Sequence, residues 1–556
     1  MKKMAETSVL EEKIATLETL VKELSERVTK QDILIKYYEE QLLLAKRHRF
    51  GISSQQIHSD QLCLENIFNE AEDQSSPLPE PTLEEIITYK RKKRIGKKAD
   101  DLSGLPVERV DYELPEEDRA CPECGDLMKD IGVTIRDELE LIPAKVVHKE
   151  HAVHAYGCGN CEKNGIRTPI IKAEAPKPLI PGSLASPSAV AHIAIQKYCN
   201  GMPLYRQERG LSYDGVVLSR QTMANWLIYC TQNYLVALYS LLIKFLLQEP
   251  VIHSDETTVQ VLHEPGRTAQ NKSYEWLYRT SGCSEHPVVI YEYQETRHQS
   301  HPQKFLKDYK GYLHTDGYQA YHNLDPGIIV VGCWFHARQY WENIYKIIPE
   351  SKRDGSNAER GLVYINLLFA FEDEFRELSY DERFKQRLKY CKPVSDAFFN
   401  WVGSLCPPPK SLLEKAVQYA LNQRVYLDNV YLNGQLEFSN NRAERSIKPF
   451  VQGRKQWLFS NTPNGAESSS ILYSIIETAK ENNLHPFQYL KYLLETLPNA
   501  TTGELEKLLP WSPDLPDWCK SSSKSGKPAP KRKKEKGALH QAMLKMKEHF
   551  APPEDD

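Results

Sequence analysis

The stretch PVIHSDETTVQVL, residues 250–262, reads as a β-strand that carries an aspartate near its centre. Side chains alternate between the two faces of a strand, so His253, Asp255 and Thr257 share one face. Aspartate is a poor strand former, and a buried charge is costly unless it is paired or bound to a metal ion. Asp255 is therefore a candidate functional residue, although the adjacent Glu256 could be the functional member of the pair.

Four further strand-like segments follow along the chain. They are SYEWLYRTSG (273–282), PVVIYEYQET (287–296), GYLHTDGYQAY (311–321) and the beginning of IIVVGCWFHARQYWENIY (328–345), whose remainder reads as a helix. A helix is expected near 297–309, and helical periodicity returns at 440–449, 465–482 and 485–497. Three antiparallel strands, a helix, a parallel strand, a helix, another strand and then helices is the element order of an RNase H-like fold.

Two more carboxylates accompany Asp255. Asp316 stands near the tip of the fourth expected strand, and Glu444 lies in the cationic stretch NNRAERSIKPF (440–450). Taken singly, Asp316 could cap a turn and Glu444 could form a surface ion pair with Lys448 one helical turn away. Acids on two neighbouring strands and a helix are, however, the hard oxygen ligands that a pair of Mg²⁺ ions requires. We therefore predict that Asp255, Asp316 and Glu444 are catalytic and hold two Mg²⁺ ions.

The basic residues near Glu444 fit such a site, because an enzyme that cuts a polyanion needs positive charge beside its metal ions. The residues expected to contact DNA phosphates here are Arg442, Arg445, Lys448, Arg454 and Lys455. Asn440 and Asn441, at the start of the same expected helix, are candidates for capping or for phosphate contact. Trp457 is a candidate for stacking on a displaced base.

Two CxxC pairs, CPEC (121–124) and CGNC (158–161), supply four thiolates. Cys121, Cys124, Cys158 and Cys161 make a soft, tetrahedral set that suits one structural zinc ion. The gap between the pairs has the composition of a hairpin, which favours a zinc ribbon. Isolated thiols or a redox pair are the alternatives.

Residues 186–230 read as three helices with short breaks, the last of them beginning at Ser219 after a turn that contains Gly215. This arrangement is typical of a helix-turn-helix. The residues available to phosphates or base edges are Arg206, Arg209, Arg220 and Gln221. Small helical bundles use the same pattern without binding DNA.

Apolar residues recur at 3-4 spacing from Leu10 to Leu42, without Pro or Gly. This heptad pattern predicts a parallel two-stranded coiled coil, and hence a homodimer or higher oligomer. A long helix packed on its own protein is the alternative. Two basic runs, KRKKRIGKK (90–98) and KSGKPAPKRKKEK (524–536), lie in segments that read as linker and tail and could attract nucleic-acid phosphate.

The composition is that of an ordinary water-soluble protein with several domains. The chain has 556 residues, 71 basic and 75 acidic, which is too long for a single core. No apolar stretch approaches the roughly 20 residues needed to span a bilayer, and the N-terminus does not read as a signal peptide. The twelve cysteines are then expected to be reduced thiols, and the protein is expected to be cytoplasmic and not to bind a membrane.

The sequence resembles, over nearly its whole length, the large transposase of the bacterial insertion-sequence sixty-six family, a group of DDE transposases. The motifs that carry the resemblance are RHRFGISSQQ, DLSGLPVERVDYELPEEDRACPECG, IPGSLASPSAVAHIAIQKY, HSDET, HTDGYQAYHNL, GCWFHAR, NNRAERSIKPFVQGRKQWLFSN, HPFQYLKYLLETLP and LLPW. The resemblance implies the catalytic triad Asp255, Asp316 and Glu444, with a helical insertion before the glutamate. It also points to Cys333 and His336 as residues that support the site; an ordinary core cysteine and a buried histidine are the plain alternative.

The expected fold class is multidomain α+β. The expected regions are a coiled coil (8–45), a linker with a basic run (46–118), a zinc-binding domain (119–165), a helix-turn-helix region (182–232), an RNase H-like catalytic domain (248–350 and 433–484) with a helical insertion (351–432), a C-terminal helical segment (485–515) and a basic disordered tail (516–556).

The expected function is binding of double-stranded DNA at the ends of an insertion sequence, followed by Mg²⁺-dependent strand cleavage and transfer to target DNA. Two other functions stay open at this point. One is a DNA-binding or repressor protein that keeps the fold without turnover, and the other is an element-encoded nuclease that cuts without joining. The resemblance also suggests that accessory proteins of the same element take part.

Overall fold

The computed structural model describes residues 146–157, 170–172 and 177–521. The expected coiled coil at 8–45 and the linker at 46–118 lie outside these residues, as do Cys121, Cys124, Cys158 and Cys161. Most of the expected tail also lies outside them. Before the expected helix-turn-helix region, the structure describes one antiparallel strand pair, in which β1 (Ala155–Gly157), within the expected zinc-binding region, pairs with β2 (Ile170–Lys172), which follows that region.

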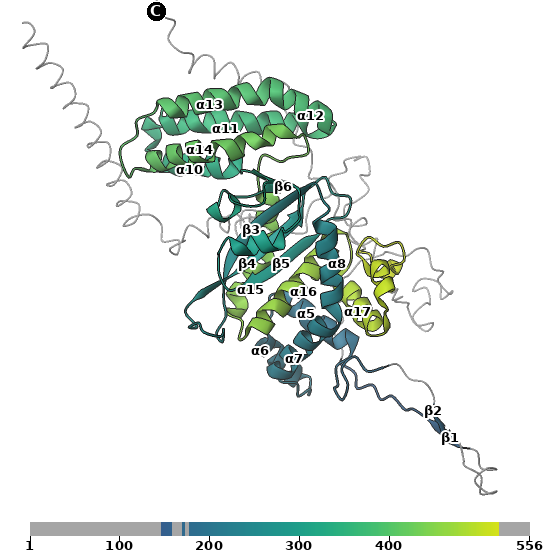
Figure 1. Cartoon of the computed structure of the whole chain (residues 1–556). Helices are drawn as coiled ribbons and strands as arrows, with labels where there is room; N and C mark the ends of the chain where they lie inside the picture. The colour runs from purple at the N-terminus through teal and green to yellow at the C-terminus, as the bar shows by residue number, and fades with distance from the viewer. Residues whose placement is uncertain (1–145, 158–169, 173–176, 522–556) are drawn as a thin grey trace, which may run out of the picture.

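A five-stranded mixed sheet lies at the centre of the described chain (Figure 1). Its strands are β3 (Val251–Gln260), β4 (Lys272–Thr280), β5 (Val289–Gln294), β6 (Gly311–His314) and β7 (Ile328–Val331). They are arranged in the order β5-β4-β3-β6-β7, with β3, β4 and β5 antiparallel to one another in turn and with β6 and β7 parallel to β3. All five expected strands are therefore present, and the strand that carries Asp255 is the central one.

The edge strand β5 is covered by α16 (Pro463–Glu481). Side chains of this helix satisfy its free backbone groups: the amide of Tyr291 donates to Oγ of Ser474 across 2.8 Å, and the amide of Val289 donates to Oγ1 of Thr478 across 3.0 Å. An uncovered sheet edge is a template for pairing with another chain, so this cover closes one side of the sheet.

The strand β6 is shorter than the expected 311–321, because the chain turns directly after it. The amide of Tyr318 donates to Oδ1 of Asp316 across 2.9 Å, which is an aspartate-stabilised turn. Gly317 has a φ of +94°, a conformation that glycine adopts more readily than other residues. A short 3₁₀ helix, η4 (Gln319–Tyr321), follows. Asp316 therefore lies just past the end of a strand and not inside one.

Three helices precede the sheet: α5 (Pro187–Tyr198), α6 (Leu204–Tyr213) and α7 (Arg220–Cys230). Ser219 caps α7 as expected, because its Oγ accepts a hydrogen bond from the amide of Thr222 across 3.1 Å. Buried residues of these helices, among them Val190, Ile193 and Leu227, belong to the same hydrophobic core as the sheet. The three helices are thus packed onto the body of the protein.

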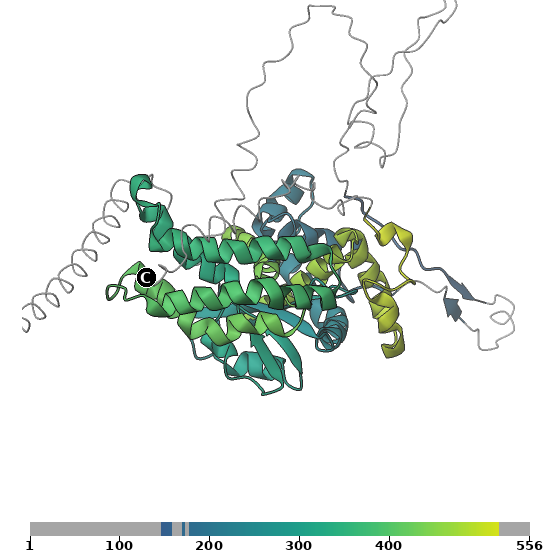
Figure 2. The ribbon, with the colours of Figure 1, turned by 90° about the horizontal axis from the view of Figure 1, so that it is seen from above.

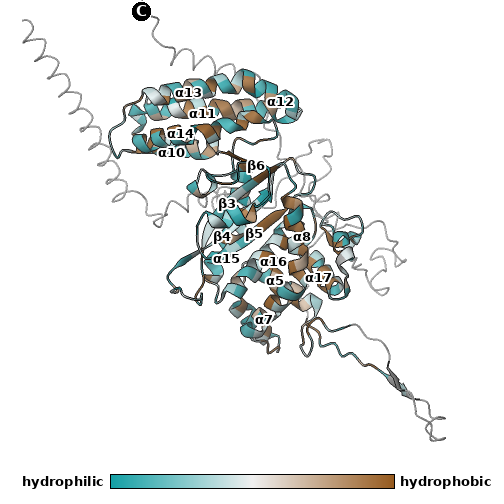
Figure 3. Cartoon of the chain, viewed as in Figure 1, coloured by the Kyte–Doolittle hydropathy of each residue, from teal (hydrophilic) through white to brown (hydrophobic). Residues whose placement is uncertain are grey.

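Helix α7 continues through a π-helical turn, η3 (Thr231–Leu235), into α8 (Val236–Leu246). Among the described residues, Arg220–Leu246 is the one helical run that is long and apolar enough to cross a membrane. Its residues Leu235, Leu238 and Leu242 are buried in the main core, as in a core helix of a globular protein. Figure 3 shows the apolar residues concentrated along α8, α16 and the strands beside them.

A layer of helices stands apart from this body (Figures 1 and 2). It consists of α10 (Trp334–Ile347), α11 (Asn357–Glu374), α12 (Tyr380–Gln386), α13 (Lys392–Ser404) and α14 (Leu412–Asp428). The layer has its own core, in which the rings of Trp341 and Trp401 lie 5.3 Å apart. The expected insertion at 351–432 is therefore helical, and it is packed on α10, which precedes it.

Buried Arg387 ties this layer to residues 433–440, which lead into α15 and are called here the pre-α15 segment. Its guanidinium donates to the carbonyl of Leu436 across 2.6 Å and to that of Asn433 across 3.1 Å, and it pairs with Glu372. A buried guanidinium needs such partners to offset the loss of its hydration. These hydrogen bonds fix the position of the pre-α15 segment, which follows the insertion.

The remaining helices are α9 (Ser300–Phe305) between β5 and β6, α15 (Asn441–Trp457), and α17 (Pro486–Thr496). Helix α15 packs on β3 and β4, and α17 packs on α5. Helix α15, whose first turn carries Glu444, therefore packs on the strand that carries Asp255.

Candidate active site

The three predicted acids come from three elements that meet at one end of the sheet. Asp255 lies in β3, Asp316 lies two residues beyond β6, and Glu444 lies in the first turn of α15. Because β3 and β6 are parallel neighbours in which His253 pairs with His314, Asp255 and Asp316 occupy the same end of the sheet. The structure therefore brings together the residues that the sequence placed 61 and 128 positions apart.

The charges of these acids are close enough to affect one another. The pKa of Asp255 is raised well above its usual value, first by burial and then by the negative charges of Glu256, Asp316 and Glu444. Like charges held together without a compensating cation cost free energy. A set of carboxylates in this condition fits a bound divalent cation, which would relieve the repulsion.

Glu256, the neighbour of Asp255, has a different environment. Its buried side chain accepts hydrogen bonds from Nε of Arg297 (2.9 Å) and from the hydroxyl of Tyr321 (2.7 Å). Burial and the charge of Asp316 raise its pKa to about 7, against the effect of Arg297. The Arg297 guanidinium also stacks on the ring of Tyr318, 3.6 Å from the centroid. Glu256 therefore holds the loop that follows Asp316.

The helical insertion contacts that same loop. The hydroxyl of Tyr419, on α14, donates to the carbonyl of Asp316 across 3.0 Å, and Nε2 of Gln423 donates to the carbonyl of Gly317 across 3.3 Å. A Cβ on Gly317 would meet Oε1 of Gln423 at 2.9 Å, so a larger residue would displace the Gln423 side chain that bonds this loop. The insertion thus positions one of the three acids.

Cys333 and His336, which the sequence resemblance suggested as residues that support the site, lie beside Glu444. Ligand atoms of Cys333, His336 and Glu444 are all within 4.8 Å of one another, and Nδ1 of His336 is 3.8 Å from Oε1 of Glu444. Burial alone would lower the pKa of His336, but neighbouring Cys333, Glu444 and Asp316 raise it to about 10. The raised pKa favours the protonated form of His336 beside Glu444.

The predicted phosphate contacts on α15 divide into two groups. Arg445 and Lys455 are exposed and Lys448 is half-buried, and their spacing places them on one side of the helix. Arg454 instead donates to Oγ1 and to the carbonyl of Thr258, and so ties α15 to β3. Arg442 pairs with Glu437 across 2.9 Å. Arg442 and Arg454 are engaged within the protein, unlike the other three.

One further expectation for this helix is wrong. Asn440 is fully buried and its side chain makes no capping bond, because it is turned inward to His253 and Ser254. Asn440 occupies the N-cap position, but its side chain neither caps the helix nor faces a phosphate site. Trp457 is half-buried and packs edge-to-face on Phe450, with ring centroids 5.5 Å apart, and its stacking on a displaced base stays a prediction.

The predicted residues of the helix-turn-helix region are all exposed. Arg206 and Arg209 lie on α6, and Arg220 and Gln221 lie in the first turn of α7. The backbone amide of Arg220 donates to Glu208 across 3.1 Å, which joins the two helices. These helices lie at the opposite end of the molecule from the insertion (Figure 1).

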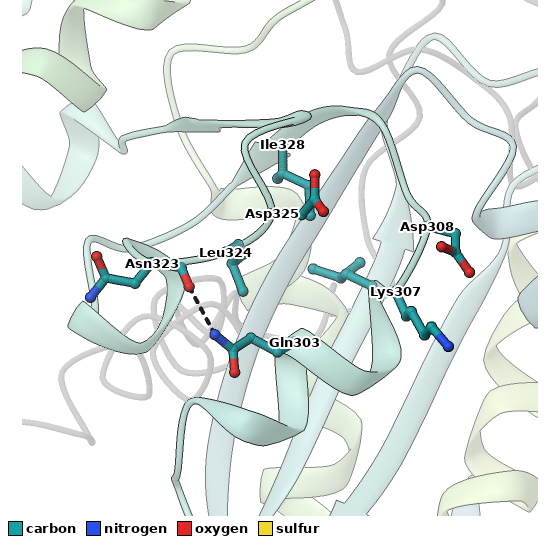
Figure 4. A pocket seen from close by; sticks show the side chains of 8 residues that line it. Gln303, Lys307, Asp308, Asn323, Leu324, Asp325 and Ile328 are labelled. Carbon is teal, nitrogen blue, oxygen red and sulfur yellow. Dashed lines mark hydrogen bonds between the residues drawn. The ribbon is translucent and has the colours of Figure 1, made fainter.

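A pocket of about 420 Å³ lies beside α9 (Figure 4). Gln303 spans it and donates to the carbonyl of Asn323 across 2.9 Å. Its wall contains Lys307, Asp308 and Asp325 but none of the three predicted acids. The predicted site is thus a cluster of side chains at a sheet end and not part of this pocket.

Models of known protein families match most of the chain. The model of the family described as Transposase IS66 family matches residues 182–468, and the IS66 C-terminal element matches 474–511. A zinc-finger binding domain of transposase IS66 matches 118–162, which contains all four candidate cysteines. A domain described as Transposase C of IS166 homeodomain matches 37–110, most of the segment expected to be a linker.

Similar proteins occur in Sinorhizobium fredii. The uncharacterized protein y4jD is 29% identical over 423 residues, which are 73% of this chain and 80% of that protein. The uncharacterized protein y4qI is 28% identical over 425 residues, which are 73% of this chain and 76% of that protein. Their names assign no activity.

Proposed function

Because the chain belongs to the IS66 family of transposases, we propose that it binds the terminal inverted repeats of its own insertion sequence, cuts DNA and joins the resulting 3′ end to target DNA. The meeting of Asp255, Asp316 and Glu444 at one end of the sheet carries this proposal. Family membership alone would not distinguish an active enzyme from a protein that had lost its acids.

The proposed fold of the catalytic region is RNase H-like. Three antiparallel strands followed by two strands parallel to the first, in the order β5-β4-β3-β6-β7, support this assignment. In this arrangement one acid lies on the central strand and another lies after its parallel neighbour. A helix packed on the central strand then supplies the third acid.

The proposed chemistry is phosphoryl transfer with two Mg²⁺ ions held by Asp255, Asp316 and Glu444. When bound, the ions would activate the attacking oxygen and stabilise the leaving oxygen. The chain itself fixes the positions of the acids: the Asx turn and α14 hold Asp316, β3 holds Asp255, and the first turn of α15 holds Glu444. His336 offsets part of the negative charge around Glu444.

DNA contacts are proposed on two surfaces. Arg445, Lys448 and Lys455 extend along α15 from Glu444 and would hold phosphates next to the acids. Arg206, Arg209, Arg220 and Gln221, on α6 and α7, would read or position the element ends. Helices α6 and α7 lie at the opposite end of the molecule from the helical insertion (Figure 1). This arrangement supports a separation of the surface that would recognise the DNA ends from the site that would cut them.

The N-terminal modules complete the proposal. Cys121, Cys124, Cys158 and Cys161 would hold one structural zinc ion, in keeping with the zinc-finger match, and four thiolates are a donor set that zinc prefers. The heptads at 8–45 would join two chains, as the assembly of two DNA ends requires. Accessory proteins of the same element are proposed partners, and the bacterial cytoplasm is the proposed compartment.

A strand-transfer assay tests the function. Purified protein is mixed with labelled DNA that carries candidate element ends, supercoiled target DNA and Mg²⁺, with and without the accessory proteins of the element. Joined products are expected. Cleavage without joining would indicate a nuclease, and end binding without any Mg²⁺-dependent cut would indicate a DNA-binding or repressor protein.

A further inference from the structure

Asp255 and Asp316 are each preceded, two residues earlier, by a fully buried histidine. His253 lies before Asp255 and His314 before Asp316, and the two histidines are direct partners in the β3–β6 register. Their rings stack with centroids 4.8 Å apart and planes within 3°. His253 and Asp255 share a face of β3, because side chains alternate along a strand. His314 is the last residue of β6, directly before the turn that carries Asp316, so the histidine stack lies in the two strands just ahead of the acids.

Both rings are hydrogen-bonded to the chain that leads into α15. Nδ1 of His253 lies 3.0 Å from Oδ1 of Asn440, and Nε2 of His314 lies 2.6 Å from the carbonyl of Glu437. The partner of each ring nitrogen is an oxygen acceptor, so His253 carries its proton on Nδ1 and His314 carries its proton on Nε2. The two histidines thus attach two strands of the sheet to the pre-α15 segment.

Asn440 connects these strands with the third acid. Its Nδ2 donates to the carbonyl of Ser254, the residue directly before Asp255, across 2.8 Å. Its backbone carbonyl accepts from the amide of Glu444 across 3.2 Å, and its own amide donates to Sγ of Cys333 across 3.1 Å. One buried asparagine therefore contacts β3, the start of α10 and the first turn of α15.

We propose that His253, His314 and Asn440 are positioning residues that set the spacing of Asp255, Asp316 and Glu444 through these hydrogen bonds. The proposal rests on the proposed function, because it names the residues that align its three acids. Three acids on separate elements must keep a fixed spacing to hold two ions, and hydrogen-bonded neighbours of metal ligands usually provide it. Ordinary core packing of two aromatic rings is the alternative.

A crossed pair of substitutions separates the two explanations. The amide nitrogen of asparagine stands close to the place of a histidine Nδ1, and that of glutamine stands close to the place of Nε2. His253→Asn and His314→Gln therefore keep the donor, whereas His253→Gln and His314→Asn misplace it. All four variants lose the ring stack equally. Only hydrogen bonding makes asparagine the better residue at one position and glutamine the better residue at the other.

The measurements are end cleavage as a function of Mg²⁺ concentration, binding to end DNA in EDTA, and the thermal midpoint. We expect His253→Gln and His314→Asn to need about 10–100-fold more Mg²⁺ for half-maximal cleavage, or to cut that much more slowly. His253→Asn and His314→Gln should stay within a few-fold of the parent chain. End binding should be equal in all four, because α6 and α7, which are proposed to bind the ends, carry neither histidine.

The same preference for asparagine or glutamine at both positions would overturn the proposal, as would an unchanged Mg²⁺ requirement in all four variants. If the histidine variants unfold at the assay temperature, Cys333→Ser and Cys333→Ala are compared instead. Serine keeps an acceptor for the Asn440 amide, whereas alanine does not. Equal Mg²⁺ requirements in that pair would then reject the proposal. A parent chain that binds the ends but never cuts them instead overturns the proposed function itself.

Discussion

Arg297 holds Glu256 through its Nε atom, 2.9 Å from Oε1, and thereby distinguishes this glutamate from the aspartate beside it. The sequence left open which of the two acids is functional. Burial and neighbouring acids raise the pKa of both carboxyl groups, but Glu256 also has a cationic and a tyrosine partner. Because Glu256 is already paired with a cation, we propose that it is a structural residue and that Asp255 is the metal ligand.

Substitution of the three acids should abolish cleavage but leave end binding intact. Asp255→Asn, Asp316→Asn and Glu444→Gln keep side-chain size and remove the negative charge that would hold Mg²⁺. Loss of several kcal/mol of transition-state stabilisation corresponds to a fall of more than about 100-fold in rate. Cleavage of labelled end DNA in Mg²⁺ and a gel shift in EDTA measure the two properties.

Two glutamates serve as controls for that experiment. Glu495→Gln alters a surface ion pair with Lys491 on α17 and should change neither property. Glu256→Gln should lower the thermal midpoint more than the cleavage rate, because it weakens the buried pair with Arg297. If Glu256→Gln abolishes cleavage while Asp255→Asn does not, the assignment of the two acids is reversed.

The crowding of acids predicts an unusual effect on stability. In the metal-free protein, Asp255→Asn should raise the thermal midpoint by a few degrees, because it removes a charge that burial and Glu256, Asp316 and Glu444 make costly. Mg²⁺ should raise the midpoint of the parent chain and not that of the variant, since a ligand stabilises only the state that binds it. Differential scanning fluorimetry in EDTA and in Mg²⁺ measures both effects. A lower midpoint for Asp255→Asn in EDTA would argue against a repulsive cluster.

Much of this arrangement could be predicted from local sequence patterns. The period-two alternation and the Val and Ile content of residues 250–262 located β3, and Ser219 located the start of α7. The end of β6 was missed because the turn depends on the side chain of Asp316 accepting from Tyr318. Strand propensity depends on residue type alone and does not predict that hydrogen bond.

Contacts between distant residues account for the other differences. Asn440 and Ser254 are 186 residues apart, and Arg454 and Thr258 are 196 apart, so no local pattern shows that both polar side chains are turned inward. A cationic helix start looks the same in sequence whether its arginine holds a phosphate or a neighbouring strand. One signal was present: the repeated His-x-Asp of HSD and HTD, at 253–255 and 314–316, marks the stacked histidines.

The two kinds of basic residue on α15 should behave differently on substitution. Arg445→Ala and Lys455→Ala should weaken binding of any DNA and reduce the slope of log affinity against log salt by about 1 each, because each removes one exposed phosphate contact. Arg454→Ala should instead lower the thermal midpoint, because its bonds to Thr258 join α15 to β3. Salt-dependent binding to end DNA and to unrelated DNA, with a thermal melt of each variant, makes the comparison. Equal salt slopes for the parent and the Lys455→Ala variant would remove that lysine from the proposed DNA surface.

Zinc content tests the N-terminal module independently of catalysis. Purified protein should contain about one equivalent of zinc, and Cys158→Ser should weaken its retention and expose the region 118–162 to protease, because folding of a small zinc module is coupled to metal binding. Cys406→Ser is the matched control, since Cys406 is an exposed free thiol in the helical insertion. Metal analysis after dialysis against a weak chelator, followed by limited proteolysis, measures both properties. A zinc-free protein whose 118–162 region resists protease would show that the four cysteines do not form a zinc site. Loss of zinc from the Cys406→Ser variant would place the ion elsewhere in the chain.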